Sequence, residues 1–170
     1  RAALDSAYAA AMARLAAEAP DDADVLTLFA ESRMLLSPWV YWTPDRKPAA
    51  GTTEMLDALE RALRLDRDHP GACHFFIHAV EAAFPARALP CAERLAALMP
   101  AAGHIVHMPG HIYLRVGRYD DAIRANLHAV HADERYLADA RGRAGFYAIA
   151  YYPHNHHFLS FAATMAGRDD

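Results

Sequence analysis

The same histidine pattern recurs in three segments of the chain, and this repetition restricts the possible folds more than any other feature. Each segment spaces its histidines so that the imidazoles share one face if the segment is a helix. The second copy follows the first by 33 residues, and the third follows the second by 50 residues. The histidines are His74 and His78 in the first segment, His104, His107 and His111 in the second, and His154 and His157 in the third. A fold that stacks equivalent helices side by side would bring these imidazoles together.

The spacing of apolar residues predicts an all-α chain. Apolar residues recur at helical intervals, and Pro, Gly and Asp separate the periodic segments. A Pro109–Gly110 pair should bend the helix that contains it. An apolar, aromatic loop over 39–51 should fold onto the domain, and 141–152 should be irregular. The expected helices span 4–19, 25–36, 52–65, 73–83, 86–99, 103–116, about 119–136 and 153–167.

Charge and hydropathy exclude two classes of partner. The net charge is −4 and comes from scattered residues of both signs, without a basic block that would bind nucleic acid or an acidic membrane. No apolar segment approaches the roughly 20 residues that a membrane span needs. We therefore expect a soluble domain without nucleic-acid binding or membrane insertion.

The chain begins at Arg1 in helical sequence, which indicates a fragment of a longer protein. Cys73 and Cys91 fall on successive expected helices and form no Cys-x-x-Cys pair. Buried thiols are favoured over a disulfide, because free Cys often packs as a small hydrophobe. The redox compartment stays open.

Internal repeats account for the order of the elements. Residues 103–136 resemble a tetratricopeptide repeat (TPR), and residues 70–102 fit the same frame with one residue missing in the turn. Weaker copies span about 23–69 and 153–170. Small and aromatic residues stand at the characteristic positions of the best copy, namely Gly110, Tyr113, Gly117, Tyr119, Ala122 and Ala129. The resemblance implies a single TPR-like domain over 1–170, a short right-handed α-solenoid of antiparallel helix pairs.

Four short strings make the resemblance more specific. They are HPGA at 69–72, IHAVE at 77–81, VHMPGHIY at 106–113 and YYPHN at 151–155. In these strings the chain is similar to a group of bacterial TPR-like helical proteins with a His-rich concave face. The resemblance implies that the histidines belong to a shared site and that members are often exported to the periplasm or secreted. It supplies no substrate or reaction.

The histidines point to a transition-metal site. In TPR proteins the first helix of each pair lines the concave groove, and all seven histidines fall on expected first helices. Neighbouring helices pack about 8–10 Å apart and a His–metal bond is about 2 Å, so histidines from different helices can reach one ion. Copper and zinc both suit imidazole. Seven histidines exceed the needs of one four-coordinate ion, so a subset binds one ion or two ions lie close together, with ligands resembling those of tyrosinases.

Two carboxylates lie near the same expected surface. Glu81 and Glu31 are candidate ligands or proton shuttles, although a solvated or Arg-paired carboxylate is the commoner role. An open position on the metal would support oxidoreductase or hydrolase chemistry on a small molecule or peptide in the groove. No Ser-His-Asp order, phosphate-binding Gly-rich loop or dinucleotide fingerprint is present.

Two other interpretations remain open at this point. A non-catalytic TPR scaffold could bind a peptide or partner protein through the groove, with the histidines as polar contacts. Arg115 and Asn155 would be the main additional groove residues for such a partner. The histidines could also serve structure alone.

Overall fold

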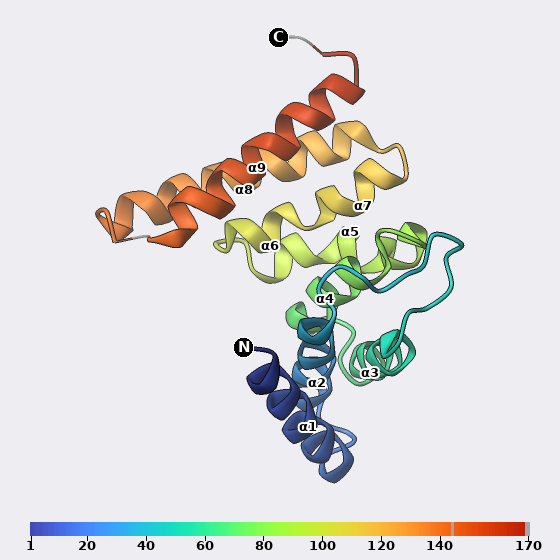
Figure 1. Cartoon of the computed structure of the whole chain (residues 1–170). Coiled ribbons are helices and arrows are strands. Elements are labelled where there is room, and N and C mark those ends of the chain that lie inside the picture. Colours follow the sequence, from blue (N-terminus) through green and yellow to red (C-terminus); the bar gives the residue numbers. More distant parts are fainter. Residues whose placement is uncertain (144, 169–170) are drawn as a thin grey trace. The chain divides into compact units, whose positions relative to one another are not determined.

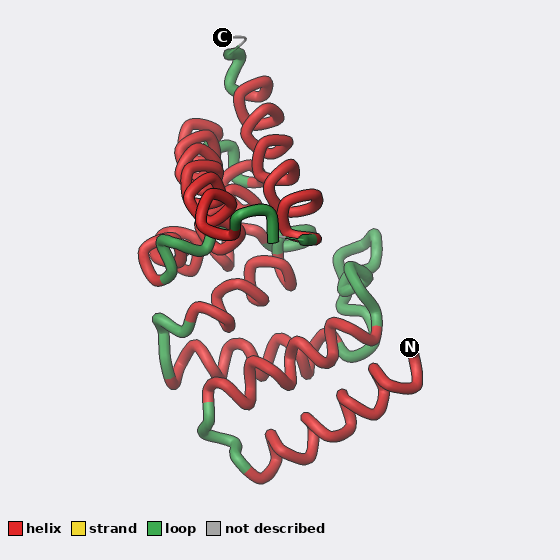
Figure 2. The backbone as a smooth tube through the Cα atoms, turned by 90° about the vertical axis from the view of Figure 1, so that its left-hand side faces the viewer, coloured by secondary structure: helices red, strands yellow, loops and turns green. Residues whose placement is uncertain are grey.

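The computed structural model describes residues 1–143 and 145–168. Over these residues the regular structure is helical, apart from one isolated bridge between Trp42 and Pro48 (Figure 2). The helical structure confirms the predicted all-α class. The chain divides into two compact units, an N-terminal unit (Arg1–Phe84) and a C-terminal unit (Pro85–Asp170). The single TPR-like domain stays a prediction.

The N-terminal unit consists of four helices that pack in chain order. They are α1 (Ala2–Glu18), α2 (Ala23–Leu36), α3 (Thr52–Leu65) and α4 (Pro70–Val80). Helix α1 packs on α2, α2 on α3, and both α2 and α3 on α4 (Figure 1). Asp22 begins α2 by accepting a hydrogen bond from the Val25 N–H at 3.0 Å. Pro70 occupies the first turn of α4, where its missing N–H leaves no helical bond unmade.

The aromatic loop between α2 and α3 folds onto its own unit, as the sequence predicts. Trp42 donates its indole N–H to the Ala79 carbonyl of α4 at 2.6 Å, and Tyr41 is buried. The Thr52 hydroxyl at the start of α3 donates to the Tyr41 carbonyl at 2.7 Å. These bonds fix the loop against α4, which carries the first pair of histidines.

The C-terminal unit is organised around its longest helix, α8 (Tyr119–Ala140). The 3₁₀ turn η1 (Pro85–Ala88) and α5 (Leu89–Leu98) precede two short helices, α6 (Gly103–His107) and α7 (Pro109–Arg115). Both short helices pack against α8, and α9 (Phe146–Met165) packs along α8 and also contacts α6 (Figure 1). The predicted bend is present as a break at Met108, because Pro109 has no N–H to continue the helical bonds.

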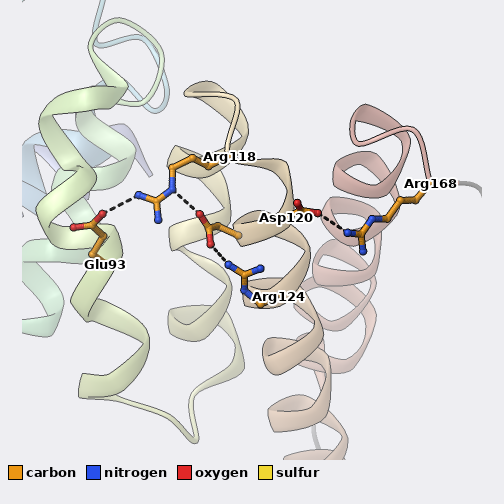
Figure 3. Close-up of polar contacts among 6 residues, drawn as sticks. Glu93, Arg118, Asp120, Arg124 and Arg168 are labelled. Atoms are coloured by element: carbon orange, nitrogen blue, oxygen red, sulfur yellow. Dashed lines mark hydrogen bonds and ion pairs between the residues drawn. The ribbon is translucent and has the colours of Figure 1, made fainter.

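Ion pairs connect elements at the surface of the C-terminal unit. Arg118, just before α8, bonds to Glu93 of α5 at 2.8 Å and to Asp121 at 2.6 Å (Figure 3). Arg168 bonds to Asp120 at 2.7 Å, joining the chain after α9 to the start of α8. These groups are largely exposed, so each pair contributes little to the free energy of unfolding.

One helix begins earlier than the sequence predicts. The expectation of irregular structure over 141–152 is wrong for its second half, because α9 begins at Phe146 and contains Pro153 in its interior. Tyr147 lies before the proline and Asn155 after it, and both donate hydrogen bonds to the buried carboxylate of Asp133 on α8, at 2.5 and 2.7 Å. Bonds on both sides of Pro153 hold the helix together across the missing N–H, a tertiary effect that local sequence does not reveal.

A close approach between α6 and α8 depends on glycine. A Cβ atom at Gly103 would overlap the carboxylate of Asp133, and it would lie 3.0 Å from the Ala129 carbonyl oxygen. Asp133 is 1 % exposed and also bonds to α9, so it has little freedom to move aside. Gly103 therefore sets the distance between the two helices.

The remaining sequence expectations concern the cysteines and the membrane. Cys73 and Cys91 are both buried thiols and form no disulfide, as the sequence predicts. Among the described residues, no helix has the length and apolar character that a membrane span requires.

Replacing Gly103 with Ala should destabilise the C-terminal unit by about 2 kcal/mol, since the added methyl group forces Asp133 out of its bonds. Hydrogen exchange over 103–140, read with increasing urea, measures this loss. Ala101→Ser, an exposed change two residues earlier, should stay within about 0.5 kcal/mol of wild type. Equal protection in Gly103→Ala and wild type would show that the helices can separate freely.

Candidate metal centre

Three histidines of the C-terminal unit converge on one point. His107 ends α6, His111 lies in α7, and His154 lies in α9. One ring nitrogen from each lies within 4.8 Å of those of the other two. His107 is fully buried, His111 is buried and His154 is half-buried. We call these three residues the histidine triad.

The break at Pro109 places His107 and His111 next to each other. Their ring centroids are 4.8 Å apart with the planes nearly perpendicular. The His154 ring lies 4.7 Å from that of His107, and the Nε2 atoms of these two rings are 3.1 Å apart. Imidazoles from three helices therefore meet edge to face, and His154 joins the other two from a distant part of the sequence.

Asn126 of α8 holds His107 from the opposite side of the ring. His107 Nδ1 lies 2.7 Å from the Asn126 side-chain oxygen, and Asn126 is fully buried. The Asn126 amide nitrogen donates to the Ala122 carbonyl of its own helix at 2.8 Å. Nδ1 of His107 is thus engaged outside the triad, which leaves Nε2 as the nitrogen that faces His154.

Phe158 forms an aromatic wall beside the triad. Its ring centroid lies 4.5 Å from that of His107, 4.5 Å from that of His111 and 4.7 Å from that of His154. Phe158 follows His154 by one helical turn, so α9 supplies both a nitrogen and an apolar cover. The ring excludes water from one side of the triad.

Burial keeps His107 uncharged. The pKa of His107 lies well below its ordinary value, mainly because burial penalises the imidazolium and also because protonated His111, His154 and His104 would repel it. The hydrogen bond with Asn126 acts in the opposite direction and is outweighed. A neutral imidazole is the form that binds metal ions, so His107 is prepared for a metal at neutral pH.

The carboxylate network of Asp133 positions His154 as well as α9. Tyr147 donates to Asp133 and in turn accepts from the His104 backbone N–H at 3.1 Å. Burial and the neighbouring carboxylate raise the pKa of Tyr147, so the phenol keeps the proton that it donates. Asn155 is buried in this network directly after His154. The interpretation of Asn155 as a groove contact is therefore wrong, since its side chain serves the packing of α9.

The other predicted histidines take different positions. The His104 ring lies 5.8 Å from that of His107 and stands edge-on to Tyr151 at 4.7 Å, next to the triad. His157 is exposed, and among the described residues it does not belong to the group of nitrogens that the triad forms. His74 and His78 belong to the N-terminal unit, where their ring centroids are 5.0 Å apart.

The two candidate carboxylates both lie in the N-terminal unit. Glu81 pairs with His78, with an oxygen 3.1 Å from Nδ1, and Trp39 packs edge-on against the same ring at 4.9 Å. Glu31 forms a hydrogen bond with Tyr8 of α1, and with burial it raises the pKa of that phenol. Their proposed roles as ligands or proton shuttles stay predictions.

Sequence reasoning missed Asn126 and Phe158. Both lie on helices whose periodicity was clear, but neither residue type stands out in a helix. The signal for Asn126 is a polar residue on the apolar side of α8, opposite a glycine of the preceding segment. A Cβ atom at Gly110 would lie 2.7 Å from the Asn126 amide nitrogen, so the small residue makes room for the polar one.

The low pKa of His107 predicts a loss of stability in mild acid. The unfolded chain takes up a proton at this residue below about pH 6.5, whereas the folded protein does not until the pH falls well below that value. Above pH 6.5 the contribution of neutral His107 to the free energy of unfolding therefore has its full value. It falls by at most about 1.4 kcal/mol per pH unit between the two pKa values.

Urea denaturation of the metal-free protein between pH 7.5 and 5, followed by hydrogen exchange over 103–140, measures this slope. The His107→Gln variant should lose part of this pH dependence of the free energy of unfolding. The control His128→Gln, at an exposed position, should retain it. The same slope in wild type and His107→Gln would contradict the prediction.

Comparisons with known proteins give no relative from which a function could be transferred. No family model, no curated protein and no solved structure matches the chain. The function is therefore inferred from the geometry of the histidine triad.

Proposed function

We propose that this protein binds a transition-metal ion, copper or zinc, through His107, His111 and His154. The observation that carries the proposal is the convergence of three ring nitrogens from three helices within 4.8 Å. Ligands bound tetrahedrally at about 2 Å lie roughly 3.3 Å from one another, a spacing that small rotations of these rings would reach. Imidazole suits both metals, and the donor set does not distinguish them.

The surroundings of the triad support a metal rather than three unrelated histidines. His107 is held by a partner outside the triad, as metal-bound histidines usually are. Its low pKa keeps protons from competing with the metal at neutral pH. Three buried or half-buried imidazoles side by side otherwise bring polar atoms together without an obvious structural benefit.

Three protein ligands leave a position for water or substrate, which is the arrangement of catalytic rather than structural zinc sites. A metal bound here would lower the pKa of a bound water or bind oxygen, depending on its identity. The chain itself supplies three imidazole ligands, a fixed orientation of His107 and an apolar wall at Phe158. We therefore propose a metalloenzyme of the hydrolase or oxidoreductase class that acts on a small molecule or peptide.

The fold around the site is part of the proposal. We propose that the helix pairs are TPR-like, that the chain belongs with the bacterial TPR-like proteins it resembles, and that the concave groove of the solenoid holds the substrate. His74 and His78 of the N-terminal unit, and His104 and His157 of the C-terminal unit, stay candidate ligands of a second ion. A scaffold that binds a peptide without a metal is the alternative, and metal content separates the two.

The first experiment measures bound metal by elemental mass spectrometry on protein purified without a His-tag. We expect about one or two equivalents of copper or zinc. Replacing His107, His111 and His154 together with Ala should remove the metal bound at the triad, because no alternative set of three nitrogens remains there. A second preparation with His74→Ala and His78→Ala shows whether the α4 pair contributes to the stoichiometry.

The matched control is His128→Ala/His131→Ala, which removes two exposed histidines of α8 outside the triad. It should retain the wild-type metal content, and circular dichroism should show the same helix content in each variant. Absence of metal in the wild type, even after incubation with Cu²⁺ or Zn²⁺, would exclude the metal centre and favour the scaffold.

A further inference from the structure

The side chain of Asn126 has only one orientation that satisfies its neighbours. One end of its amide lies 2.8 Å from the Ala122 carbonyl oxygen, which can only accept a hydrogen bond. The amide nitrogen must therefore face Ala122, and the amide oxygen faces His107 at 2.7 Å. Asn126 is fully buried, so water does not offer an alternative partner.

This orientation determines the tautomer of His107. The Asn126 oxygen can only accept, so His107 Nδ1 must carry the proton. A neutral imidazole has a single N–H, so a neutral His107 ring with its proton on Nδ1 has none on Nε2. The lone pair is therefore on Nε2, the atom that lies 3.1 Å from His154 Nε2. In the metal-free protein the proton between these two nitrogens belongs to His154.

Two glycines leave the space that the side chains of Asn126 and Asp133 on α8 require. Gly110 lies opposite Asn126, and Gly103 lies opposite Asp133. The two glycines, on α6 and α7, are seven residues apart, and so are the two polar residues, which lie two helical turns apart on α8. The approach of α6 and α7 to α8 therefore places both buried polar side chains in a fixed register beside the histidines.

We propose that Asn126 is a positioning residue that fixes His107 as the Nδ1–H tautomer. The lone pair of His107 is then on Nε2, the nitrogen that faces the triad. The inference rests on the proposed function, because Nε2 is then the atom that His107 offers to the metal. His107 would then offer a metal its Nε2 lone pair without changing tautomer, whereas His154 would have to carry its proton on Nδ1 to offer Nε2.

The neutral amide has a chemical consequence for the centre. A carboxylate at this position would draw the Nδ1 proton and make His107 a more basic ligand. An amide cannot accept the proton fully, so His107 would bind a metal as a neutral ligand and leave more positive charge on it. Such a metal would favour the activation of a bound water.

The tautomer can be measured without a metal. Long-range ¹H–¹⁵N correlation spectra of histidine-labelled, metal-free protein at pH 8 separate the Nδ1–H and Nε2–H forms of each ring. We expect His107 as the Nδ1–H form and His154 as the Nε2–H form. Addition of Zn²⁺ should change the pattern of His154 and leave the Nδ1 proton of His107 in place. His107 found as the Nε2–H form would overturn the proposal.

Two substitutions test whether Asn126 causes this tautomer. Asn126→Leu keeps the approximate volume and removes the acceptor, and it should release His107 to a mixture of tautomers and weaken Zn²⁺ binding about 10–100-fold. Asn126→Asp keeps an acceptor toward His107 and should retain the Nδ1–H form, with Zn²⁺ affinity within about tenfold of wild type. Leu127→Ala, an exposed change at the neighbouring position, should match wild type.

The outcomes separate this proposal from the proposed function. If Asn126→Leu does not fold, the wild-type spectrum and the Asn126→Asp variant decide the question. An Asn126→Leu variant with the wild-type tautomer and affinity would overturn the positioning role. A wild type that shows the Nδ1–H form but takes up no metal supports the assignment of Asn126 and excludes only the metal centre.

Discussion

The buried carboxylate of Asp133 is the interaction on which the C-terminal unit depends. It accepts hydrogen bonds from Tyr147 and Asn155 of α9, and Tyr147 also accepts one from the backbone N–H of His104. A buried charge is strongly unfavourable unless donors surround it, so this carboxylate defines where α6 and α9 must lie. His154, next to Asn155, is thereby brought to His107. The position of the candidate metal centre follows from a polar network that contains none of its ligands.

Local sequence was sufficient to predict most helices, and it was insufficient where tertiary contacts override local preference. Pro153 indicated a helix start, because the sequence shows the missing N–H and not the bonds that compensate for it. The Pro109 break was predictable, since the same missing N–H has no such compensation there. The difference between these two prolines is Asp133, which bonds to side chains on both sides of Pro153. Hydrogen bonds between side chains as far as 22 residues apart leave no periodic signal in the sequence.

The site was predictable in its ligands and not in its supporting residues. Helical spacing identified His107 and His111 as neighbours, and the recurrence of the pattern identified His154. The same reasoning included His157, which is exposed because α9 turns only one face toward α8. Asn126 and Phe158 carry no motif, and their roles depend on which residue lies opposite them in space. The nearest sequence signal is the seven-residue spacing of Gly103 and Gly110, which indicates a close helix approach and not its purpose.

Different parts of the His107 ring contact different helices. Helix α8 engages Nδ1 through Asn126, α9 covers a side of the ring with Phe158, and Nε2 faces His154. Burial by these same elements removes the competing proton by lowering the pKa of the ring. A histidine that only stabilised the core would need one satisfied nitrogen and an apolar surrounding. His107 has these and also directs its remaining lone pair toward two further imidazoles, an arrangement that packing alone does not require.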